Sequence, residues 1–499
     1  MLFNSLQFIF VFIPLILFGY FLISRLTSNS TYNILFLAIA SLIFYGYWDL
    51  KFIPVISISI LLNYIFGIFI NNKNLKFRKL IFISAVALNL SVIFFYKYLN
   101  FGIEIFNMAS SHKMEAMKII LPLGISFFTF TQIAYLADVL YGHPGERNFF
   151  KYFLFVTYFP HLIAGPILHH KEMMPQFNTK NKNLFSTENL AIGLTVFSIG
   201  LFKKVIIADG FSLIANPIFT AITKQEITSL DAMIGALSYT LQIYFDFSGY
   251  SDMAVGLSFM FGIKLPFNFD APYKSQSMIE FWQRWHITLS RFLRDYLYIA
   301  LGGNRKGALR RYVNLILTML LGGLWHGAGW TFVAWGFLHG MYLSINHWWR
   351  GLVNSNKVIS KFSNNFLYKL SSLILTQFCV VIAWVYFRAD SLHHANNMVK
   401  TIFGIKQGNN LINSSVQIWI IAFILLSYAI CILLPNLNSI FDKCEIGLKT
   451  YQTKTPWNAV VIKWNMTLSW VIITSLLLIF SLLFILIVGD GTEFLYFRF

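Results

Sequence analysis

Two histidines in the segment 281–340 stand among apolar residues, where an imidazole could carry out proton chemistry. His326 lies within LLGGLWHGAGW, and His286 lies earlier, within FWQRWHITLS. A neutral imidazole can take a proton from a hydroxyl group at neutral pH. Ionisable residues are costly in apolar membrane surroundings, so their presence there suggests a function. We therefore interpret His326 and His286 as candidate catalytic residues.

Both histidines also have a structural interpretation. His326 could be a buried histidine satisfied by a carbonyl group, with the neighbouring glycines serving helix packing. Under the catalytic interpretation, the same glycines would let a long thin substrate approach the ring; they are Gly322, Gly323, Gly327 and Gly329. His286 could equally be a histidine tolerated in an interfacial helix. The residue types alone leave both alternatives open.

The segment 281–297 has the pattern of one amphipathic helix at a membrane surface. On a helical wheel its apolar residues fall in one arc, with His286 at the edge. They are Phe281, Trp282, Trp285, Leu289, Phe292, Leu293, Tyr296 and Leu297. Arg284, Arg291 and Arg294 lie on the other side. These arginines could bind the phosphates of a cytoplasmic donor, with Arg284 and Arg291 as the donor-binding candidates, or they could face lipid headgroups.

Four more residues are expected along a substrate tunnel: Trp282, Trp325, Asp246 and Asp252. The tryptophans are expected to form belt and wall rather than to react. The two aspartates would point to opposite faces of an unbroken helix. We expect a break at 248–249, with a carboxylate capping the freed amides. A direct catalytic role for the aspartates is the alternative.

The segment PHLIAGPILHH, at 160–170, places two prolines, a glycine and three histidines where a membrane span is expected. Irregular backbone at that depth is tolerated where it is packed in protein or lines a cavity. The middle of the chain is therefore expected to surround a polar pocket or tunnel. His161, His169 and His170 lack the spacing of a regular metal site, and we predict no metal there.

The composition indicates an all-α polytopic membrane protein. Of the 499 residues, 57% are hydrophobic and 12% are charged, which is about half the charge of a soluble protein. Apolar runs predict roughly 11 to 12 transmembrane helices. They are expected at 7–24, 33–50, 52–70, 80–99, 119–141, 149–168, 188–215, 231–262, 312–349 (broken), 369–387, 415–435 and 465–488. No linker divides the chain, so one membrane domain is expected over 1–499, with N-terminal spans in 1–120, a catalytic core in 121–389 and C-terminal spans in 390–499.

The net charge of +18 comes from lysines and arginines scattered through short loops. Such residues determine membrane topology, and their scatter argues against nucleic-acid binding. The basic loop 71–79 is expected in the cytoplasm, which places the N-terminus outside. The basic loop 302–311 likewise puts 281–297 on the cytoplasmic face, and the segment 489–499 is expected outside. The three cysteines are too few and too dispersed for a disulfide framework or a metal site.

Five motifs occur in fixed order: YFPHLIAGPI, QIYFDFSGYSDMAVGL, PFNFDAPY, FWQRWHITLSRFLRDYLYIALGGNR and GGLWHGAGWTFVAWGFLHG. In these the chain resembles the membrane-bound O-acyltransferases (MBOAT), in the branch of the alginate O-acetylases and the peptidoglycan O-acetyltransferase membrane subunit. The resemblance runs from about 121 to 389, and the ending LYFRF is also in the style of the alginate branch. It implies a ring of tilted helices around a thin centre, with a central tunnel between funnels from the two sides and with cytoplasmic interfacial helices.

The resemblance also implies roles for individual residues and partners. His326 matches the essential histidine of the family, and His286 matches its second catalytic-site histidine. The family has a different residue where this chain has His161, so no role is carried onto it. A periplasmic SGNH-like acetyltransferase subunit is implied as the partner that completes transfer to the sugar.

Together these features predict a membrane-bound O-acetyltransferase of the bacterial cytoplasmic (inner) membrane, in contact with membrane lipid. It would move an acetyl group from acetyl-CoA to an extracytoplasmic polysaccharide, either peptidoglycan or an alginate-like exopolysaccharide, and acetyl-CoA would be a donor substrate rather than a bound cofactor. A proton-coupled transporter or flippase is one alternative. A non-catalytic scaffold of a glycan export complex is another, and it predicts that both histidines are replaceable.

Overall fold

The computed structural model describes residues 1–27, 29–177, 186–448, 460–489, 494 and 495, and these are mostly helical. Two short strands occur among them, β1 (Leu265–Pro266) and β2 (Gly447–Leu448). The strands pair in parallel, with Leu265 opposite Gly447. The expected all-α fold class is confirmed.

The elements follow one another without a long connecting segment of irregular structure. The N-terminal ones are η1 (Phe8–Phe12), α1 (Ile13–Leu26), α2 (Ser30–Gly46), η2 (Leu50–Phe52), α3 (Ile53–Asn71), α4 (Arg78–Ile93), η3 (Phe94–Tyr98), α5 (Leu99–Ala109), α6 (Ile125–Leu140), α7 (Phe149–Thr157), α8 (Phe159–Leu162) and α9 (His170–Phe177). The central ones are α10 (Thr187–Phe202), η4 (Lys203–Ala208), α11 (Asp209–Ala221), α12 (Ser229–Met260), η5 (Pro272–Lys274), α13 (Met278–Arg284), α14 (Ile287–Phe292), η6 (Leu293–Tyr298), α15 (Gly307–His326) and α16 (Trp330–Ser355). The C-terminal ones are α17 (Lys357–Ser363), α18 (Phe366–Arg388), α19 (Leu392–Ile402), α20 (Ser414–Leu433), α21 (Leu437–Ile440), η7 (Asp442–Cys444) and α22 (Leu468–Val488).

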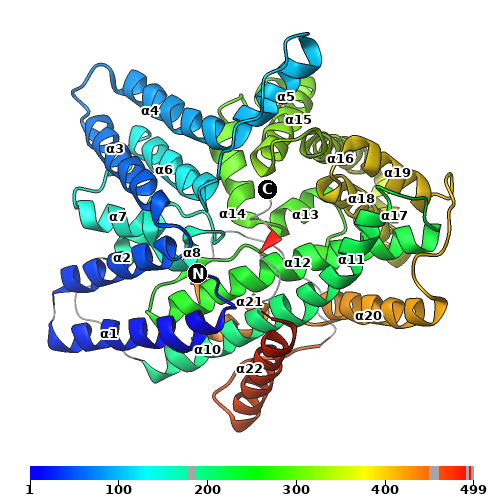
Figure 1. Cartoon of the computed structure of the whole chain (residues 1–499). Coiled ribbons are helices and arrows are strands. Elements are labelled where there is room, and N and C mark those ends of the chain that lie inside the picture. Colours follow the sequence, from blue (N-terminus) through cyan, green and yellow to red (C-terminus); the bar gives the residue numbers. More distant parts are fainter. Residues whose placement is uncertain (28, 178–185, 449–459, 490–493, 496–499) are drawn as a thin grey trace.

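The 32-residue helix α12 crosses the centre of the molecule, with α1 to α4 on one side and α16, α18, α19 and α20 on the other (Figure 1). Its N-terminus is capped by Thr228, whose hydroxyl accepts a hydrogen bond from the Asp231 amide. Almost all of its residues are buried. A helix that is buried all round must lie inside the protein, because no face of it is left for solvent or lipid.

Glycines bring α12 close against α10. A Cβ atom at Gly249 would lie 2.7 Å from the carbonyl oxygen of Gly200, and one at Gly256 would lie 2.6 Å from that of Gly193. Small residues at such contacts allow two helix backbones to approach closely. The expected break at 248–249 is therefore wrong, because α12 continues without interruption and Gly249 serves helix packing.

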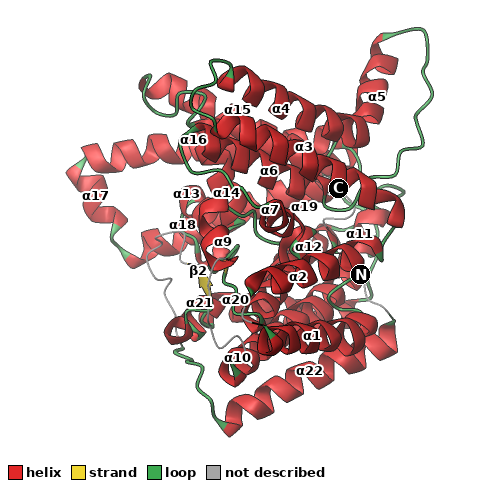
Figure 2. Ribbon diagram, turned by 90° about the vertical axis from the view of Figure 1, so that its left-hand side faces the viewer, coloured by secondary structure: helices red, strands yellow, loops and turns green. Residues whose placement is uncertain are grey.

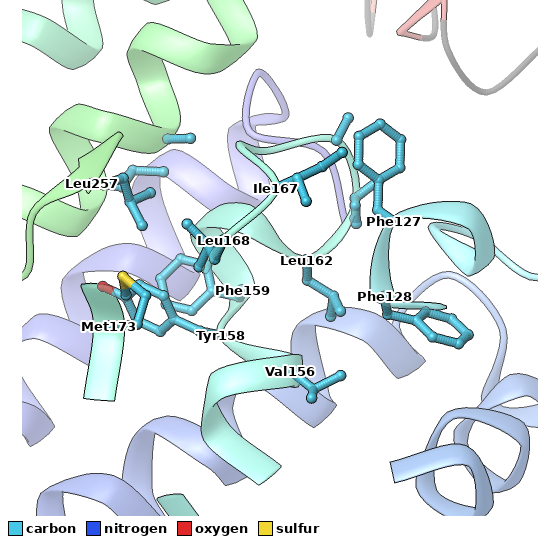
Figure 3. Packing of buried hydrophobic residues seen from close by; sticks show 14 of the residues in the cluster. Phe127, Phe128, Val156, Tyr158, Phe159, Leu162, Ile167, Leu168, Met173 and Leu257 are labelled. Carbon is cyan, nitrogen blue, oxygen red and sulfur yellow. The ribbon is translucent and has the colours of Figure 1, made fainter. Parts of the chain in front are cut away.

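The segment 158–169 is buried and mostly irregular. The expected span 149–168 is not one helix, since α7 ends at Thr157 and α8 has four residues. Figure 3 shows how the side chains of this segment lie among those of neighbouring helices: Tyr158, Phe159, Leu162, Ile167 and Leu168 pack in one cluster with Phe127, Phe128 and Leu257. The irregular backbone is thus packed in protein, which is one of the two conditions under which it was expected at this depth.

Seven helices of the described residues are long and apolar enough to cross a membrane. They are 8–26, 50–71, 78–109, 187–221, 366–388, 414–433 and 468–488, and two shorter apolar helices span 30–46 and 125–140. The expected 11 to 12 spans also included α12, α15 and α16, which have the length but a more polar composition. In Figure 2, α17 and α5 project from opposite edges of this helical body. The chain is a multi-pass membrane protein.

Candidate active site

His326 is the last residue of α15, and its position follows from a short break in an apolar run. The residues 327–329 are not helical, and α16 begins at Trp330. The expected break in the run 312–349 is confirmed. The side chain of His326 is buried, with 5% of the residue exposed.

Aromatic rings surround His326. The ring centroids of Trp325, Trp335 and Phe387 lie 4.8, 5.0 and 5.2 Å from that of the imidazole, each in an edge-to-face arrangement. These residues belong to α15, α16 and α18, so three helices define the environment of one histidine. A dry aromatic site strengthens any hydrogen bond that the imidazole makes to a substrate.

The last turn of α15 is held by residues from the N-terminal part of the chain. Lys97 donates from Nζ to the carbonyl oxygens of Trp325, at 2.6 Å, and His326, at 2.9 Å. The hydroxyl of Tyr98 donates to the carbonyl oxygen of Leu324, at 2.6 Å. The final carbonyls of a helix have no partner inside the helix and carry partial negative charge. These two η3 residues therefore fix the helix end that carries His326.

The glycines beside His326 serve mainly to pack α15 against α16. A Cβ atom at Gly323 would clash with the backbone of Phe332, and one at Gly327 would clash with the ring of that same residue. Gly336 in α16 meets the backbone of α15 in the same way. The expectation that all four glycines clear a path to the imidazole is wrong for Gly323 and Gly327, whose missing side chains would fill space already taken by α16.

His286 lies at a sharp bend rather than within one long helix. The segment 281–297 forms α13, a break at 285–286, α14 and η6, and His286 has φ = 42°. The expected single amphipathic helix is therefore wrong. A left-handed conformation at a non-glycine residue costs about 1–3 kcal/mol and persists where the surrounding structure holds it.

The segment 268–270, from the PFNFD motif, holds this bend. Asp270 donates from its amide to the carbonyl oxygen of Arg284, and Ile287 donates to that of Asn268, each at 3.0 Å. The hydroxyl of Thr288 donates to Oδ1 of Asn268 at 2.6 Å. Hydrogen bonds on both sides of His286 thus fix its backbone, and periodicity within 281–297 could not reveal them because they come from outside that segment.

The two histidines share one neighbour. The ring of Trp325 lies 4.8 Å from that of His326 and 6.3 Å from that of His286. His286 is fully buried and meets the ring of Phe247 edge-to-face at 4.7 Å. The structure therefore brings both sequence-predicted histidines and Trp325 together in one aromatic cluster.

A third buried histidine, His339, joins this cluster and was missed from the sequence. It lies in α16, and its Nδ1 atom accepts a hydrogen bond from Nε1 of Trp282 at 3.2 Å. Its ring is 4.7 Å from that of Trp335, which also contacts His326. The signal was the one that pointed to His326, namely a histidine inside an apolar run. Trp282 therefore lies in the wall of the site, as expected for a tunnel residue.

Asp246 and Asp252 form ion pairs with two consecutive lysines of η4. Asp252 lies 2.6 Å from Nζ of Lys203, and Asp246 lies 2.8 Å from Nζ of Lys204. Lys204 also contacts Asp209, at 2.7 Å. These pairs replace the expected helix-capping role of the aspartates, since an unbroken α12 has no freed amides at this position.

The C-terminal part of the chain returns to this region. The Leu495 amide donates to Oδ2 of Asp246 at 3.1 Å. The ring of Phe494 stacks on that of Tyr250 at 4.8 Å and contacts that of Phe247 at 5.6 Å. The remaining residues of the LYFRF ending, 496–499, lie outside the described residues.

The three arginines of 281–297 have different environments. Arg284 is 3% exposed, and its guanidinium bonds to the carbonyl oxygen of Asp270 and to the carboxylate of Glu280, both at 3.0 Å. It does not lie on a polar helix face, because the bend at 285–286 turns it inward. Arg291 pairs with Glu172 at 2.7 Å, and Arg294 is exposed beside Asp295.

Lys274 lies near this buried arginine. Its Nζ donates to the carbonyl oxygen of Leu434 at 2.8 Å. Burial and the positive charge of Arg284 lower the pKa of Lys274 to about 8. Asp270 acts in the opposite direction.

The histidines of 160–170 do not converge on a common centre. His161 bonds through Nε2 to the carbonyl oxygen of Phe155 at 2.8 Å, and His169 faces Tyr296 at 3.1 Å. Within the described ranges, no group of three or more histidine, cysteine or acidic side chains could hold a metal ion.

A buried histidine at a broken membrane helix, enclosed by aromatic rings and next to a second histidine, defines a membrane protein with a site for proton transfer. A family model for the membrane-bound O-acyltransferases matches residues 143–385. The chain is 42% identical over 434 residues to the peptidoglycan O-acetyltransferase of Helicobacter pylori, covering 81% of this chain and 80% of that protein. It is 42% identical over 410 residues to the probable alginate O-acetylase AlgI of Pseudomonas putida, covering 81% and 80%. It is 31% identical over 248 residues to the teichoic acid D-alanyltransferase of Streptococcus thermophilus, covering 48% and 59%.

The chain therefore belongs to the membrane-bound O-acyltransferase family, and it is an O-acyltransferase. The resemblance read from the motifs is confirmed.

Proposed function

We propose that the chain takes an acetyl group from cytoplasmic acetyl-CoA and passes it through the membrane for O-acetylation of an extracytoplasmic polysaccharide. The names of the relatives support acyl transfer to a polysaccharide, with peptidoglycan and alginate as the two candidate polymers. The observation that carries the proposal is the placement of His326 at the end of α15, among aromatic rings and next to the second histidine. The basic loops support an N-terminus outside the bacterial inner membrane.

In this mechanism the Nε2 or Nδ1 atom of His326 accepts the proton of an acceptor hydroxyl. The hydroxyl oxygen attacks the thioester carbonyl carbon, the carbon–sulfur bond breaks, and the thiolate takes a proton from the imidazolium. The thioester is already activated, so enclosure of donor and acceptor in one narrow site supplies proximity. His286 orients the donor or assists proton transfer, and an acetyl-histidine intermediate is the alternative route.

The other predicted site residues take supporting roles. Trp325 and Trp282 form the wall of the path, and the ion pairs of Asp246 and Asp252 hold α12 beside it. Arg284 stabilises the bend at His286 through its bonds to 270 and 280. A periplasmic SGNH-like subunit then completes transfer to the sugar, because the described residues form a membrane body without a soluble domain of that kind.

The test measures the acetate that mild base releases from purified cell wall and from exopolysaccharide. Four strains are compared: wild type, deletion, deletion with His326→Ala, and deletion with the matched control His393→Ala, which changes an exposed histidine of α19. We expect acetate to disappear from one polymer on deletion, to return with His393→Ala and to stay absent with His326→Ala. Full return with His326→Ala would overturn the catalytic assignment.

A second measurement separates the enzyme from a transporter or scaffold. Purified protein is supplied with acetyl-labelled acetyl-CoA, and release of the label is followed. A proton-coupled transporter or a scaffold gives no release above that of His326→Ala, whereas the proposed enzyme does.

A further inference from the structure

A second cluster of buried polar side chains lies apart from the two catalytic histidines. Tyr296, in η6, donates from its hydroxyl to Oδ1 of Asp138 at 2.7 Å. The same hydroxyl oxygen lies 3.1 Å from Nδ1 of His169, and the tyrosine and imidazole rings are stacked. His169 is 4% exposed and Asp138 is 7% exposed. Since the tyrosine proton goes to Asp138, Nδ1 of His169 donates to the tyrosine oxygen, which leaves Nε2 as a hydrogen-bond acceptor.

A charged pair extends this cluster. Arg291, in α14, lies 2.7 Å from Oε1 of Glu172, in α9. Glu172 donates from its amide to the carbonyl oxygen of His169, so the two belong to one turn. Arg291 and Tyr296 likewise lie on adjoining elements. The α9 turn and the α14–η6 segment thus place acceptors and a cation side by side.

Several polar atoms of this cluster are buried and have no hydrogen-bond partner among the described residues. They are Oδ2 of Asp138, Nε2 of His169, Nε2 of His170, Oε2 of Glu172 and Nη1 of Arg291. Buried donors and acceptors are nearly always paired in folded proteins, because leaving them unpaired is destabilising. Acceptors and a donor together in one place fit a ligand that presents both kinds of group.

A line of aromatic rings connects this cluster with His326. Tyr296 contacts Phe292 at 5.1 Å, Phe292 stacks on Phe130 at 4.4 Å, and Phe130 stacks on Trp325 at 5.4 Å. Trp325 in turn contacts His326 at 4.8 Å. A ligand held at the polar cluster would therefore meet an apolar wall that leads to the catalytic imidazole.

The cluster lies on the side of the molecule that carries basic loops. Asp138 is near the end of α6, and the segment that follows bonds to the loop after α3, where the Gly145 amide donates to Asn71. The loop after Asn71 is the basic loop 71–79. Tyr298, two residues after Tyr296, contacts Gly303 in the basic loop that precedes α15. A donor from the cytoplasm would reach this cluster before it reached His326.

We propose that Asp138, His169, Tyr296, Glu172 and Arg291 bind the pantetheine arm of the thioester donor. This inference rests on the proposed function. The arm contains two amides, each with one N–H donor and one carbonyl acceptor, which match the acceptor atoms of the carboxylates and His169 and the donor atom of Arg291. The thioester and its acetyl group are apolar and would extend along the aromatic wall. Acetyl-CoA and a phosphopantetheinylated carrier protein share this arm.

The test is equilibrium binding to the purified full-length protein in lipid nanodiscs. The probes are free pantetheine, CoA and a phosphopantetheinylated carrier protein. The variants are His169→Leu, its conservative counterpart His169→Gln, Tyr296→Phe and the matched control Tyr298→Phe, which removes a hydroxyl two positions away. We expect His169→Leu and Tyr296→Phe to weaken pantetheine binding about tenfold or more, and His169→Gln to retain affinity within about threefold. Tyr298→Phe and His326→Ala should bind as wild type does.

The outcomes separate this site from the proposed function. Unchanged pantetheine and CoA affinity in His169→Leu and Tyr296→Phe would overturn the site, and so would a wild-type protein that binds none of the three probes. Binding of the carrier protein alone, weakened by the same variants, supports the site with the carrier as donor. If His169→Leu does not fold, Tyr296→Phe and His169→Gln give the answer. Normal cell acetate in His169→Leu, with none in His326→Ala, would remove the site and leave the acetyltransferase assignment standing.

Discussion

The change Lys97→Met tests how His326 is held at the end of α15. Methionine keeps the length of the side chain but removes the donor of two hydrogen bonds, to the carbonyl oxygens of Trp325 and His326. A hydrogen bond from a charged group contributes about 1.5–3 kcal/mol in soluble proteins, and interhelical hydrogen bonds in membranes average about 0.6 kcal/mol. We therefore expect the ordered state of this helix turn to lose about 2 kcal/mol.

This loss should affect the reaction more than the fold. If only the ordered turn is reactive, about 2 kcal/mol corresponds to a fall in kcat of about 30-fold. The KM for the donor should change less than about threefold, because Lys97 contacts the helix end and not the proposed donor path. The assay is acetyl release from labelled acetyl-CoA by purified protein, together with thermal unfolding. Lys97→Arg keeps a cationic donor and should recover part of the activity.

The matched control is Lys113→Met, which removes a lysine that donates to the Asn107 carbonyl oxygen on an exposed loop. It should leave kcat unchanged. Wild-type kcat in Lys97→Met would refute the reasoning, since it would show that the last turn of α15 keeps its arrangement without this lysine. A loss of folded protein in proportion to the loss of activity would also refute it, because the effect would then be global.

Three further changes test other parts of the structure. Gly323→Ala places a methyl group against the backbone of α16 and should destabilise the protein by about 1–3 kcal/mol in chemical denaturation, whereas Gly351→Ala, which meets open space, should not. Lys203→Met should cost about 3 kcal/mol by leaving Asp252 buried without its cation, and the double variant with Asp252→Leu should recover most of this; equal stability of the single and double variants would contradict the ion-pair account. The pKa of Lys274 is about 8 in the folded chain against an ordinary 10.5, so the unfolded chain binds this proton more tightly and the free energy of unfolding should rise with pH between these values. Lys274→Met should flatten that rise in thermal unfolding, and an identical pH profile would show that another group is responsible.

Local pattern was sufficient to find the positions of the central residues. A histidine inside an apolar run is visible in the sequence, and the structure buries both His326 and His286 in one aromatic cluster. Glycines and a change of pattern at 327–329 were also sufficient to predict the break after α15. Their catalytic roles stay predictions.

Features that depend on distant partners could not be predicted. The wheel of 281–297 placed Arg284 on a polar face, but hydrogen bonds from 268–270 bend the chain at His286 and turn the arginine inward. Asp246 and Asp252 were expected at a helix break because their lysine partners lie on a different helix, some 40 to 50 residues earlier. The contact from Lys97 spans more than 200 residues, and no period within either segment carries that information.

The hydrogen bond from Leu495 to Asp246 also affects how the protein is made. These residues are 249 positions apart, so a growing chain inserts α13 through α22 into the membrane before this bond can form. Until then, the carboxylate of Asp246 is held by Lys204 alone among the contacts described for it. The wall of Phe247 and Tyr250 beside His286 is likewise completed by Phe494 only at that late stage. Biosynthesis therefore finishes the catalytic centre last, after the membrane helices around it are already in place.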